Sequence, residues 1–400
     1  MKTSSRLGRV SRRTIGATVG IGATLSSILM TGCGGPEAAL LAAAGIPVPP
    51  ADSFNSETLI GGSTSRLVFS QTQIPDLSNV SVDPSAYSAN LSSLDPNTGV
   101  ATGASSGAVL AAGPAVSDGT WIATADYEKD TLRIVNLDTG ATSQILAGLV
   151  THGLQPIALD AGRVLVTIPR GGQTVLVIHN LNTGAEAIRV ENLINQYGGV
   201  ALRGDILAMR VFPSIDASAP PALDALFSSN VDYVDLSSGV RKTIATVTGD
   251  AQDGFVGIGD GRIVWTESGD AATTVRVFDT HSGQTSTLAQ LPNSSTPSSE
   301  YASIVGVDAA GVLVSRSTTP DAPSSTADLA TTTSHQALEL IDFDGQTRVL
   351  DEYDTSLSDP SYYSSPPAMV GNFAVYRNAK SGEWFVFDAS TQSTRAIKPY

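Results

Sequence analysis

The chain has 400 residues, with 23 Lys and Arg against 38 Asp and Glu, and a formal net charge of −15. This acidic balance disfavours binding to nucleic acid and to anionic lipid surfaces, because both select basic proteins. Hydrophobic residues make up 41% of the chain, charged residues only 15%, and there are 38 glycines. Apolar segments separated by many turn residues are typical of an all-β protein.

The N-terminal segment has the pattern of an export signal. Residues 1–13 contain no acidic residue and five basic ones: Lys2, Arg6, Arg9, Arg12 and Arg13. An uncharged, largely apolar stretch follows up to Met30, and Thr31-Gly32 precede Cys33. A basic start, a short apolar segment and small residues before a cleavage point predict a secretory signal peptide over residues 1–32. The chain after it holds 18 Lys and Arg against 38 Asp and Glu, a net charge near −20.

Cys33 is the only cysteine, and the tripeptide before it resembles the lipobox of bacterial lipoproteins. The resemblance implies that Cys33 becomes the first mature residue and carries diacylglycerol, so that two acyl chains attach the protein to a membrane. A buried free cysteine is the alternative. Residues 11–15 resemble a twin-arginine signal, so general secretory and twin-arginine export both stay open. We therefore expect a periplasmic or surface-exposed envelope protein, on the inner or the outer membrane.

Residues 33–57 are rich in Ala, Pro and Gly, and we interpret them as a lipidated cysteine followed by a flexible tether. Residues 58–400 are repetitive. One repeated element is an Asp or Asn followed after two or three residues by Gly. It begins at Asp95, Asn136, Asn180, Asp235, Asp279 and Asp342, and in a last copy without Gly at Asp388.

A second element precedes each copy and consists of a lead residue, usually Gly, followed by mostly apolar residues. The lead residues are Ser65, Gly119, Gly162, Gly204, Gly261, Gly311 and Gly371. The spacing from the lead residue to the Asp or Asn is 17 or 18 in four copies and 30 or 31 in three. Each unit fits a four-stranded meander in which the Asp or Asn caps a turn and the next Gly takes the left-handed conformation. One such unit cannot cover both of its faces, but units stacked around an axis can.

The seven copies predict an all-β, seven-bladed β-propeller of four-stranded antiparallel blades over residues 58–400. Six or eight blades stay open, because the first copy is degenerate. Residues 119–146 and 261–288 resemble the repeats of TolB-like propellers and, more loosely, of quinoprotein-like ones. The resemblance implies the fold and hardly anything about function.

Groups with catalytic chemistry are sparse in this sequence. The four histidines, His152, His179, His281 and His335, lack metal-ligand spacing, and no phosphate-binding glycine loop is present. Quinone-binding propellers place a Trp after each repeat Gly, and this chain has none there. We therefore predict no catalytic residue, no metal and no cofactor. Trp121, Trp265 and Trp384 lie in apolar strands and are expected to pack in the core.

The three long units carry their extra residues at about 71–89, 212–230 and 317–336, between the second and third strands of a unit. All three insertions are expected at one face of the ring, together with a fourth connection, 351–367. Long loops on a rigid scaffold commonly bind partners. The candidate partner-binding residues are Asp76, Asp83, Tyr87, Asp216, Asp224, Asp321, Asp328, Tyr353, Asp354, Tyr362 and Tyr363. A solvated Ser/Pro loop is the alternative for residues 351–367.

We expect a monomer that binds a protein or glycan partner through this face without catalysing a reaction. The alternative is a hydrolase or lyase that acts on polysaccharide with carboxylates near the central channel. An acid and a base at the spacing of glycosidic cleavage would distinguish the alternative.

Overall fold

The protein is described from a computed structural model that covers residues 56–73, 88–101, 110–111, 114–126, 129–146, 155–170, 173–193, 197–211, 228–248, 255–268, 272–292, 299–319, 333–356, 366–378 and 380–399. Every regular element in these ranges is a β-strand. Within them there is no helix of the length and apolarity that crossing a membrane requires.

The strands form one sheet of eight and five sheets of four. The large sheet has the order β4-β3-β2-β1-β5-β6-β7-β8 and comprises β1 (Ser56–Ser63), β2 (Arg66–Gln73), β3 (Ser88–Leu94), β4 (Leu110–Ala111), β5 (Ala115–Ser117), β6 (Trp121–Asp126), β7 (Thr131–Asn136) and β8 (Thr142–Ile145). The next two sheets comprise β9 (Gln155–Asp160), β10 (Arg163–Arg170), β11 (Gln173–Asn180) and β12 (Ala185–Leu193), then β13 (Tyr197–Arg203), β14 (Ile206–Val211), β15 (Ser228–Asp235) and β16 (Val240–Thr248).

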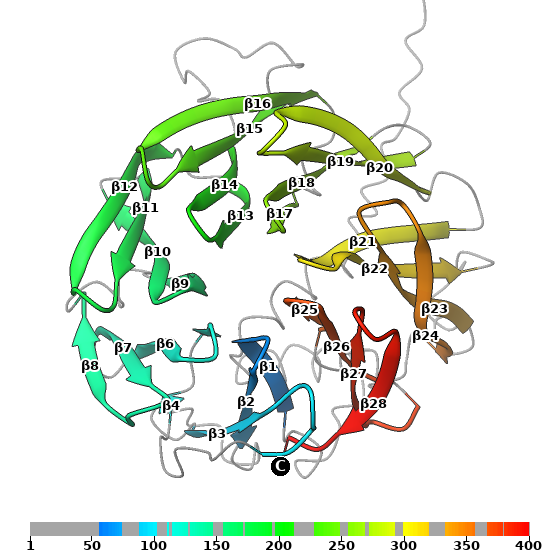
Figure 1. The fold of residues 1–400 in the computed structure, drawn as a ribbon, viewed down its shortest axis with the longest axis horizontal. Helices are drawn as coiled ribbons and strands as arrows, with labels where there is room; N and C mark the ends of the chain where they lie inside the picture. Colours follow the sequence, from blue (N-terminus) through cyan, green and yellow to red (C-terminus); the bar gives the residue numbers. More distant parts are fainter. Residues whose placement is uncertain are drawn as a thin grey trace, which may run out of the picture.

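The last three sheets follow the same antiparallel meander. They comprise β17 (Val256–Gly259), β18 (Arg262–Ser268), β19 (Ala272–Asp279) and β20 (Gln284–Pro292); β21 (Ser299–Asp308), β22 (Gly311–Thr319), β23 (Thr333–Ile341) and β24 (Thr347–Ser356); and β25 (Ala368–Val370), β26 (Phe373–Arg377), β27 (Trp384–Asp388) and β28 (Ser393–Ile397). Figure 1 shows the sheets arranged as a ring, with the first strand of each nearest the axis and the fourth outermost.

The predicted all-β propeller is confirmed, but the prediction of seven separate four-stranded blades is wrong. Five blades have four strands, and the first two repeat units share the eight-stranded sheet through a parallel pairing of β1 with β5, Gly61 opposite Ser117. The pairing requires a close approach: a Cβ on Gly61 would lie 2.2 Å from the carbonyl oxygen of Ser117, and φ of Gly61 is +130°. Glycine has no Cβ and tolerates positive φ, so here the two inner strands come within hydrogen-bonding distance.

The apolar core lies in the seams, by which we mean the interfaces between consecutive repeat units around the ring. Val164 and Val166 of β10 pack against the preceding unit, whereas Leu165 between them packs against the following one. The same alternation holds for Val312, Leu313 and Val314 of β22. Side chains of a strand alternate between the two faces of its sheet, and both faces are covered here. This is why the middle strands are continuous apolar runs.

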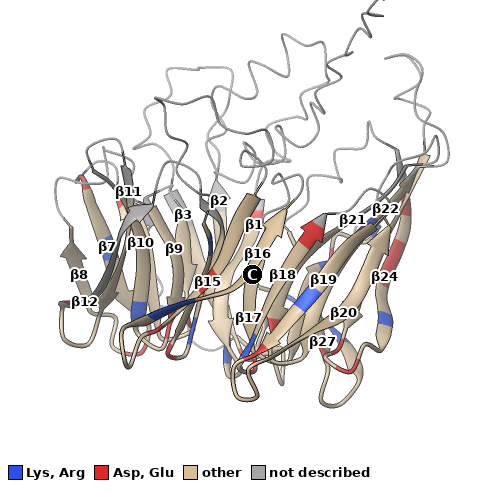
Figure 2. Cartoon of the chain, turned by 90° about the horizontal axis from the view of Figure 1, so that it is seen from above, with Lys and Arg blue, Asp and Glu red and all other residues tan. Residues whose placement is uncertain are grey.

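The ring has two distinct faces. Every turn between the first and second strands, and between the third and fourth, lies at what we call the turn face. Figure 2 shows many of the Lys, Arg, Asp and Glu residues along this edge, at the bottom of the view. The second strands end at the other side of the ring, which we call the opposite face. The strands that flank the three connections predicted to be long end there, at residues 73 and 88, 211 and 228, and 319 and 333.

The ring closes by side-chain contacts between its first and last units. Trp384 of β27 and Phe69 of β2 form an edge-to-face pair with ring centroids 5.0 Å apart. The Trp384 Nε1–H donates to Glu57 Oε2 at 2.9 Å, and Arg395 donates to the carbonyl oxygen of Asn97. The last sheet is formed entirely by C-terminal strands. Apolar packing and these hydrogen bonds therefore join the two ends of the described chain.

Candidate functional site

The repeated Asp and Asn residues act as turn caps, as predicted. Asn136 Oδ1 accepts hydrogen bonds from the backbone N–H groups of Asp138 and Thr139 at 3.0 and 2.9 Å, and Gly140 has φ of 69°. Asp279 accepts from the two equivalent N–H groups, and these hydrogen bonds hold its pKa below the usual range. A carboxylate already engaged in this way stabilises a turn and is poorly placed for proton transfer.

A second set of carboxylates joins neighbouring units at the turn face. Asp118 accepts from the N–H of Gly162 at 2.7 Å, and Asp160 accepts from the N–H of Gly204 at 2.7 Å. Asp308 accepts from the N–H of Gly371 at 2.6 Å. In each case the carboxylate belongs to the inner-strand side of one unit and the amide to the lead Gly of the next. These three hydrogen bonds tie consecutive units together, and the sequence analysis did not identify them.

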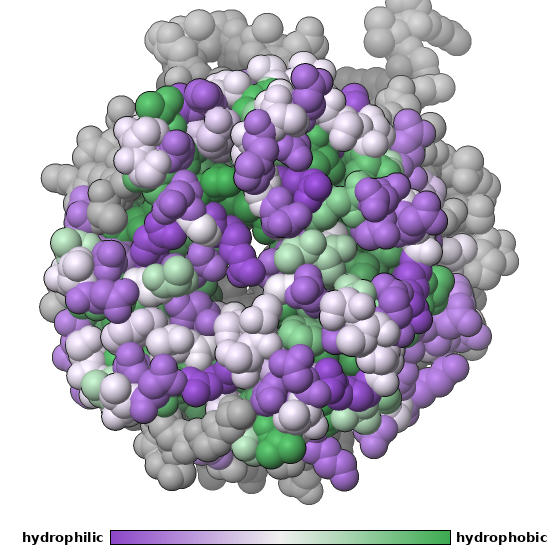
Figure 3. Space-filling model, viewed as in Figure 1, coloured by the Kyte–Doolittle hydropathy of each residue, from purple (hydrophilic) through white to green (hydrophobic). Residues whose placement is uncertain are grey.

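Three charged residues form an axial bridge at the turn face, where the inner strands end. Arg203 at the end of β13 lies 3.4 Å from Asp160 and 2.9 Å from Asp308. Gly259, the last residue of the intervening β17, has no side chain to obstruct this contact. Burial raises the pKa of Asp308, and the positive charge of Arg203 opposes that shift. Figure 3 shows the ring along its axis, with a hollow at the centre that hydrophilic residues border in part.

Among the predicted partner-binding residues, the structure describes Tyr353 and Asp354, both in β24 near the opposite face. Asp354 is exposed, and its Oδ1 lies 2.9 Å from Nδ1 of His335 on the neighbouring β23. Tyr353 is half-buried. On the other side of β23, the Gln336 amide donates to the hydroxyls of Ser317 and Ser334 at 2.7 and 2.9 Å. This buried network holds the strand ends that present His335 and Asp354.

The remaining predicted site residues lie outside the described ranges, and so does the predicted lipidation site Cys33. They are Asp76, Asp83, Tyr87, Asp216, Asp224, Asp321, Asp328, Tyr362 and Tyr363. Within the described ranges, no three His, Asp, Glu or Cys residues are grouped so as to hold a metal ion. Trp265 and Trp384 are buried and Trp121 packs against a core cluster, as predicted for all three.

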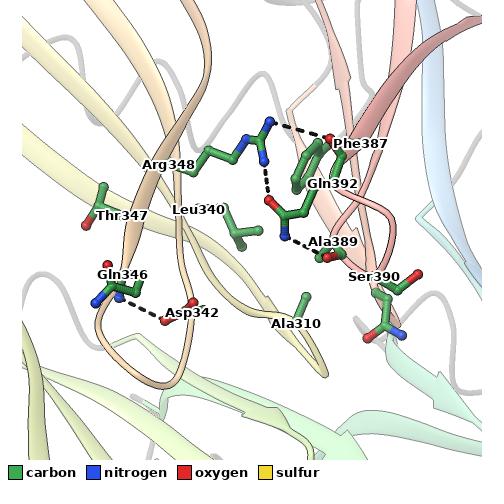
Figure 4. Close-up of a pocket in the computed structure, with 11 residues that line it drawn as sticks. Ala310, Leu340, Asp342, Gln346, Thr347, Arg348, Phe387, Ala389, Ser390 and Gln392 are labelled. Atoms are coloured by element: carbon green, nitrogen blue, oxygen red, sulfur yellow. Dashed lines mark hydrogen bonds between the residues drawn. The ribbon is translucent and has the colours of Figure 1, made fainter.

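A pocket of about 300 Å³ opens in the seam between the β21–β24 sheet and the β25–β28 sheet. Its apolar wall includes Leu340, Phe387 and Ala389. Arg348 extends from β24 so that its guanidinium lies 4.7 Å from the centre of the Phe387 ring, and it donates hydrogen bonds to Gln392 across the opening (Figure 4). The Asp342 Oδ1, on the same rim, accepts from the backbone N–H of Gln346 at 2.8 Å.

One position of the repeat recurs in the seams between units. The residue directly after each repeated Asp or Asn is Pro96, Leu137, Leu181, Leu236, Thr280, Phe343 or Ala389. We call it the wedge position. Leu137, Leu181, Leu236 and Phe343 each pack into the seam with the preceding unit. Ala389 is the smallest residue of the series, and the pocket of about 300 Å³ lies beside it. A pocket of about 290 Å³ lies in the preceding seam, beside Phe343.

No protein-family model matches the chain, and no curated protein sequence matches it significantly. Solved structures do. An acylaminoacyl peptidase from Pyrococcus horikoshii is 12% identical with a TM-score of 0.51, over 88% of this chain and 54% of its own. TolB from Acinetobacter baumannii is 12% identical with a TM-score of 0.39, over 82% and 79% of the two chains. An oligogalacturonate lyase from Vibrio parahaemolyticus is 12% identical with a TM-score of 0.41, over 70% and 74%.

The chain therefore spans about half the length of the peptidase, and at this identity the likeness concerns the fold alone. The values for TolB and the lyase are lower, and nothing about function is taken from them.

Proposed function

We propose that the protein is a non-catalytic, lipid-anchored component of the cell envelope that binds a protein or glycan partner through the opposite face of its propeller. The observation that carries the proposal is the placement of His335 and Asp354 on adjacent strands at that face. Both are exposed, and a buried hydrogen-bond network holds their strands in place. Binding residues on a rigid scaffold lose little conformational entropy when a partner docks.

The hydrogen bonds that the carboxylates of the turn face accept support binding rather than catalysis. Asp118, Asp160, Asp279 and Asp308 accept backbone hydrogen bonds within turns or between units. These groups stabilise the ring. The axial position of Arg203 adds an ion-paired bridge at the turn face, away from the proposed partner surface.

A pull-down experiment tests the partner surface. The mature chain carrying His335→Gln and Asp354→Asn together is used as bait in envelope extracts, beside the unmodified chain. The matched control is Asp344→Asn, which changes an exposed carboxylate at the turn face. We expect the double variant to lose a specific partner that the control retains. Recovery of the same partner by all three proteins contradicts the proposed surface.

Lipid anchoring is tested separately through Cys33. Replacement by Ser removes the thiol that would carry diacylglycerol, so we expect the protein to leave the membrane fraction and to stop incorporating labelled fatty acid. A Cys33→Ser protein that stays in the membrane fraction contradicts the anchor without affecting the partner surface.

The axial bridge supports a second candidate function, a polysaccharide hydrolase or lyase. Two carboxylates, Asp160 and Asp308, both lie within ion-pair distance of Arg203 at the turn-face end of the axis, and the pKa of Asp308 is raised by burial. Raised carboxyl pKa values are typical of general acids. Release of reducing ends or unsaturated products from acidic polysaccharides by the chain, and its loss in Asp308→Asn, favours this candidate. No turnover of such substrates rejects it.

A further inference from the structure

The outermost strand of each unit has one edge that faces away from the ring (Figure 1). In the part of the chain that the structure describes, no strand pairs with the outer edge of β12, β16, β20, β24 or β28. An edge strand presents unpaired backbone N–H and C=O groups, to which another extended chain can add. Proteins protect such edges by keeping the strand short or by placing charged residues on it.

The outer strands of this propeller show both kinds of protection, with one exception. β4 and β8 are short, with two and four residues. Each longer outer strand except β20 contains charged residues. They are Glu186, Arg189 and Glu191 in β12, Arg241 and Lys242 in β16, Arg348, Asp351, Glu352 and Asp354 in β24, and Arg395 in β28.

β20 has nine residues and no Lys, Arg, Asp or Glu. Its first four residues, 284–287, are all exposed, and they pair one by one with β19 from Asp279 back to Arg276. Hydrogen-bonded and non-hydrogen-bonded pairs alternate in an antiparallel ladder, so every second residue directs its N–H and C=O away from the neighbouring strand. This stretch of β20 therefore offers backbone donors and acceptors at an edge that no charge protects.

A pocket of about 290 Å³ lies against the same stretch of β20. Gln284, Ser286 and Thr287 of β20 line it together with Ser282 of the preceding turn, and Phe343 of the next unit contributes an aromatic ring. Three hydroxyls and one amide thus supply hydrogen-bonding groups beside the edge. The pocket next to β24 lacks this combination, because the strand beside it carries four charged residues.

The edge and the pocket together specify the chemistry of an occupant. The edge requires an extended polypeptide backbone, and the adjacent pocket can take one of its side chains. Strand addition to a sheet edge works in this way, with backbone hydrogen bonds for affinity and pockets for specificity. Another protein is favoured over a second copy of this chain, because the mature chain has a net charge near −20 and two copies repel each other.

We propose that the outer edge of β20 binds an extended, uncharged segment of a partner protein as an added strand, with one hydrogen-bonding side chain of that segment in the adjacent pocket. This surface lies on the rim of the ring, near the turn face, and is separate from the partner surface at the opposite face. An uncharged segment suits the edge, because no charged group has to be desolvated when the two strands pair.

Fluorescence anisotropy with a labelled, end-capped peptide tests the proposal. The probe is Thr-Ile-Ala-Thr-Val-Thr, the chain's own sequence at 243–248, which is uncharged and already forms part of an outer strand. Two comparison peptides carry N-methyl groups, one on the odd-numbered and one on the even-numbered residues of the probe. An added strand uses the N–H groups of only one of these sets, because alternate residues face opposite edges.

We expect the probe to bind the mature chain at submillimolar concentration. One N-methylated peptide should bind at least tenfold more weakly, and the other within about threefold of the probe. No binding of the probe at millimolar concentration, or an equal effect of the two methylation patterns, overturns the proposal. These measurements use the unmodified chain, so they do not depend on whether any variant folds.

Two variants locate the binding. Thr285→Lys places a charge on the edge and should weaken binding of the probe at least tenfold, whereas Thr347→Lys makes the same change at an exposed residue of β24 and should leave binding unchanged. Ser286→Phe fills the pocket and should weaken binding severalfold. Unchanged binding by a folded Thr285→Lys or Ser286→Phe protein overturns the assignment to this edge and pocket.

Sedimentation velocity distinguishes the partner segment from a second copy of the chain. We expect the mature chain to sediment as a monomer at the concentrations used for peptide binding. A dimer that Thr285→Lys abolishes and Thr347→Lys retains would show that a second copy occupies the edge, and would overturn the assignment to another protein.

Discussion

The β21–β24 sheet has two neighbours, and its two seams differ in the residue at the wedge position. Toward β17–β20 the residue is Phe343, which packs on the apolar cluster beside a pocket of about 290 Å³, and the Arg262 guanidinium lies 4.7 Å from the centre of its ring. Toward β25–β28 the residue is Ala389, beside a pocket of about 300 Å³. That seam is held by the apolar cluster around Leu313 and Tyr376 and by the hydrogen bond from Gly371 to Asp308.

The comparison shows that the repeat tolerates different side chains in its seams without a change of fold. A capping Asp precedes the wedge position in both units. The side chain at that position then sets how much apolar surface is buried there, whereas pockets of similar volume lie beside both residues.

The largest expected effect comes from removing the aromatic ring at the wedge position. Phe343→Ala should lower the free energy of unfolding by about 2–3 kcal/mol, since a half-buried aromatic ring loses its packing and the adjacent pocket grows. Ala389→Gly, at the equivalent position of the next seam, should cost about 0.5–1 kcal/mol. Urea denaturation followed by tryptophan fluorescence measures both. Similar losses in the two variants would mean that the seams do not differ in packing.

The second prediction concerns Asp308, the carboxylate that joins the β21–β24 and β25–β28 sheets. Burial raises the pKa of Asp308, with Arg203 opposing the shift, so the folded state binds a proton more readily than the unfolded state. The contribution of this group to stability is therefore fully present below its unfolded pKa, near 3.8. It is lost as the pH rises through the raised folded value.

Asp308→Asn removes this titration and serves as the reference. The free energy of unfolding of the unmodified chain, minus that of Asp308→Asn, should fall as the pH is raised from about 4 to 7. The raised pKa of Asp351 is common to both proteins and cancels in the difference. A difference that is flat or rises over this range would show that burial does not raise the pKa of Asp308.

Filling the pocket beside Ala389 should have a smaller effect of opposite sign. Ala389→Leu should raise the free energy of unfolding by about 1 kcal/mol, the usual gain from filling a cavity with apolar atoms. The same denaturation curves measure it, and Ala141→Leu at an exposed turn should change little. A loss of more than about 1 kcal/mol would indicate overpacking, and would mean that the seam is already closed.

The smallest expected effect comes from the arginines above the two aromatic rings. Arg262→Met should lower stability by about 0.5–1 kcal/mol, because Arg262 covers Phe343 and also pairs with Asp260 at 2.7 Å. Arg348→Met should cost less, since its hydrogen-bond partners are neutral. Thermal denaturation at low and high salt separates the ionic part, which should shrink with salt for Arg262 alone.

Much of the local structure followed from patterns that neighbouring residues produce. The capping Asp and Asn residues, the strands around Val164 and Val312, and the packing of Trp265 were all predicted and are confirmed. The long second-to-third connections were predicted from spacing, and the strands that flank them lie as expected. Partner binding, lipidation of Cys33 and the monomeric state stay predictions.

Other features depend on residues far apart in the chain. Nothing near Gly61 indicates that β1 pairs with β5, and Arg203 meets Asp160 and Asp308 only because three inner strands end around one axis. Trp384 and Glu57 are 327 residues apart. These contacts could not be predicted, because a repeat pattern specifies each unit and leaves open how closely units approach.

By itself, the sequence determined where strands and turns form, since apolar periodicity and Asp, Asn and Gly preferences act over a few residues. It also determined that similar units must stack, because one sheet cannot bury both of its own faces. Only the tertiary structure decided that two units merge into one sheet and which charges meet at the axis. Those outcomes depend on distances between separate units, and a single Cβ on Gly61 would change one of them.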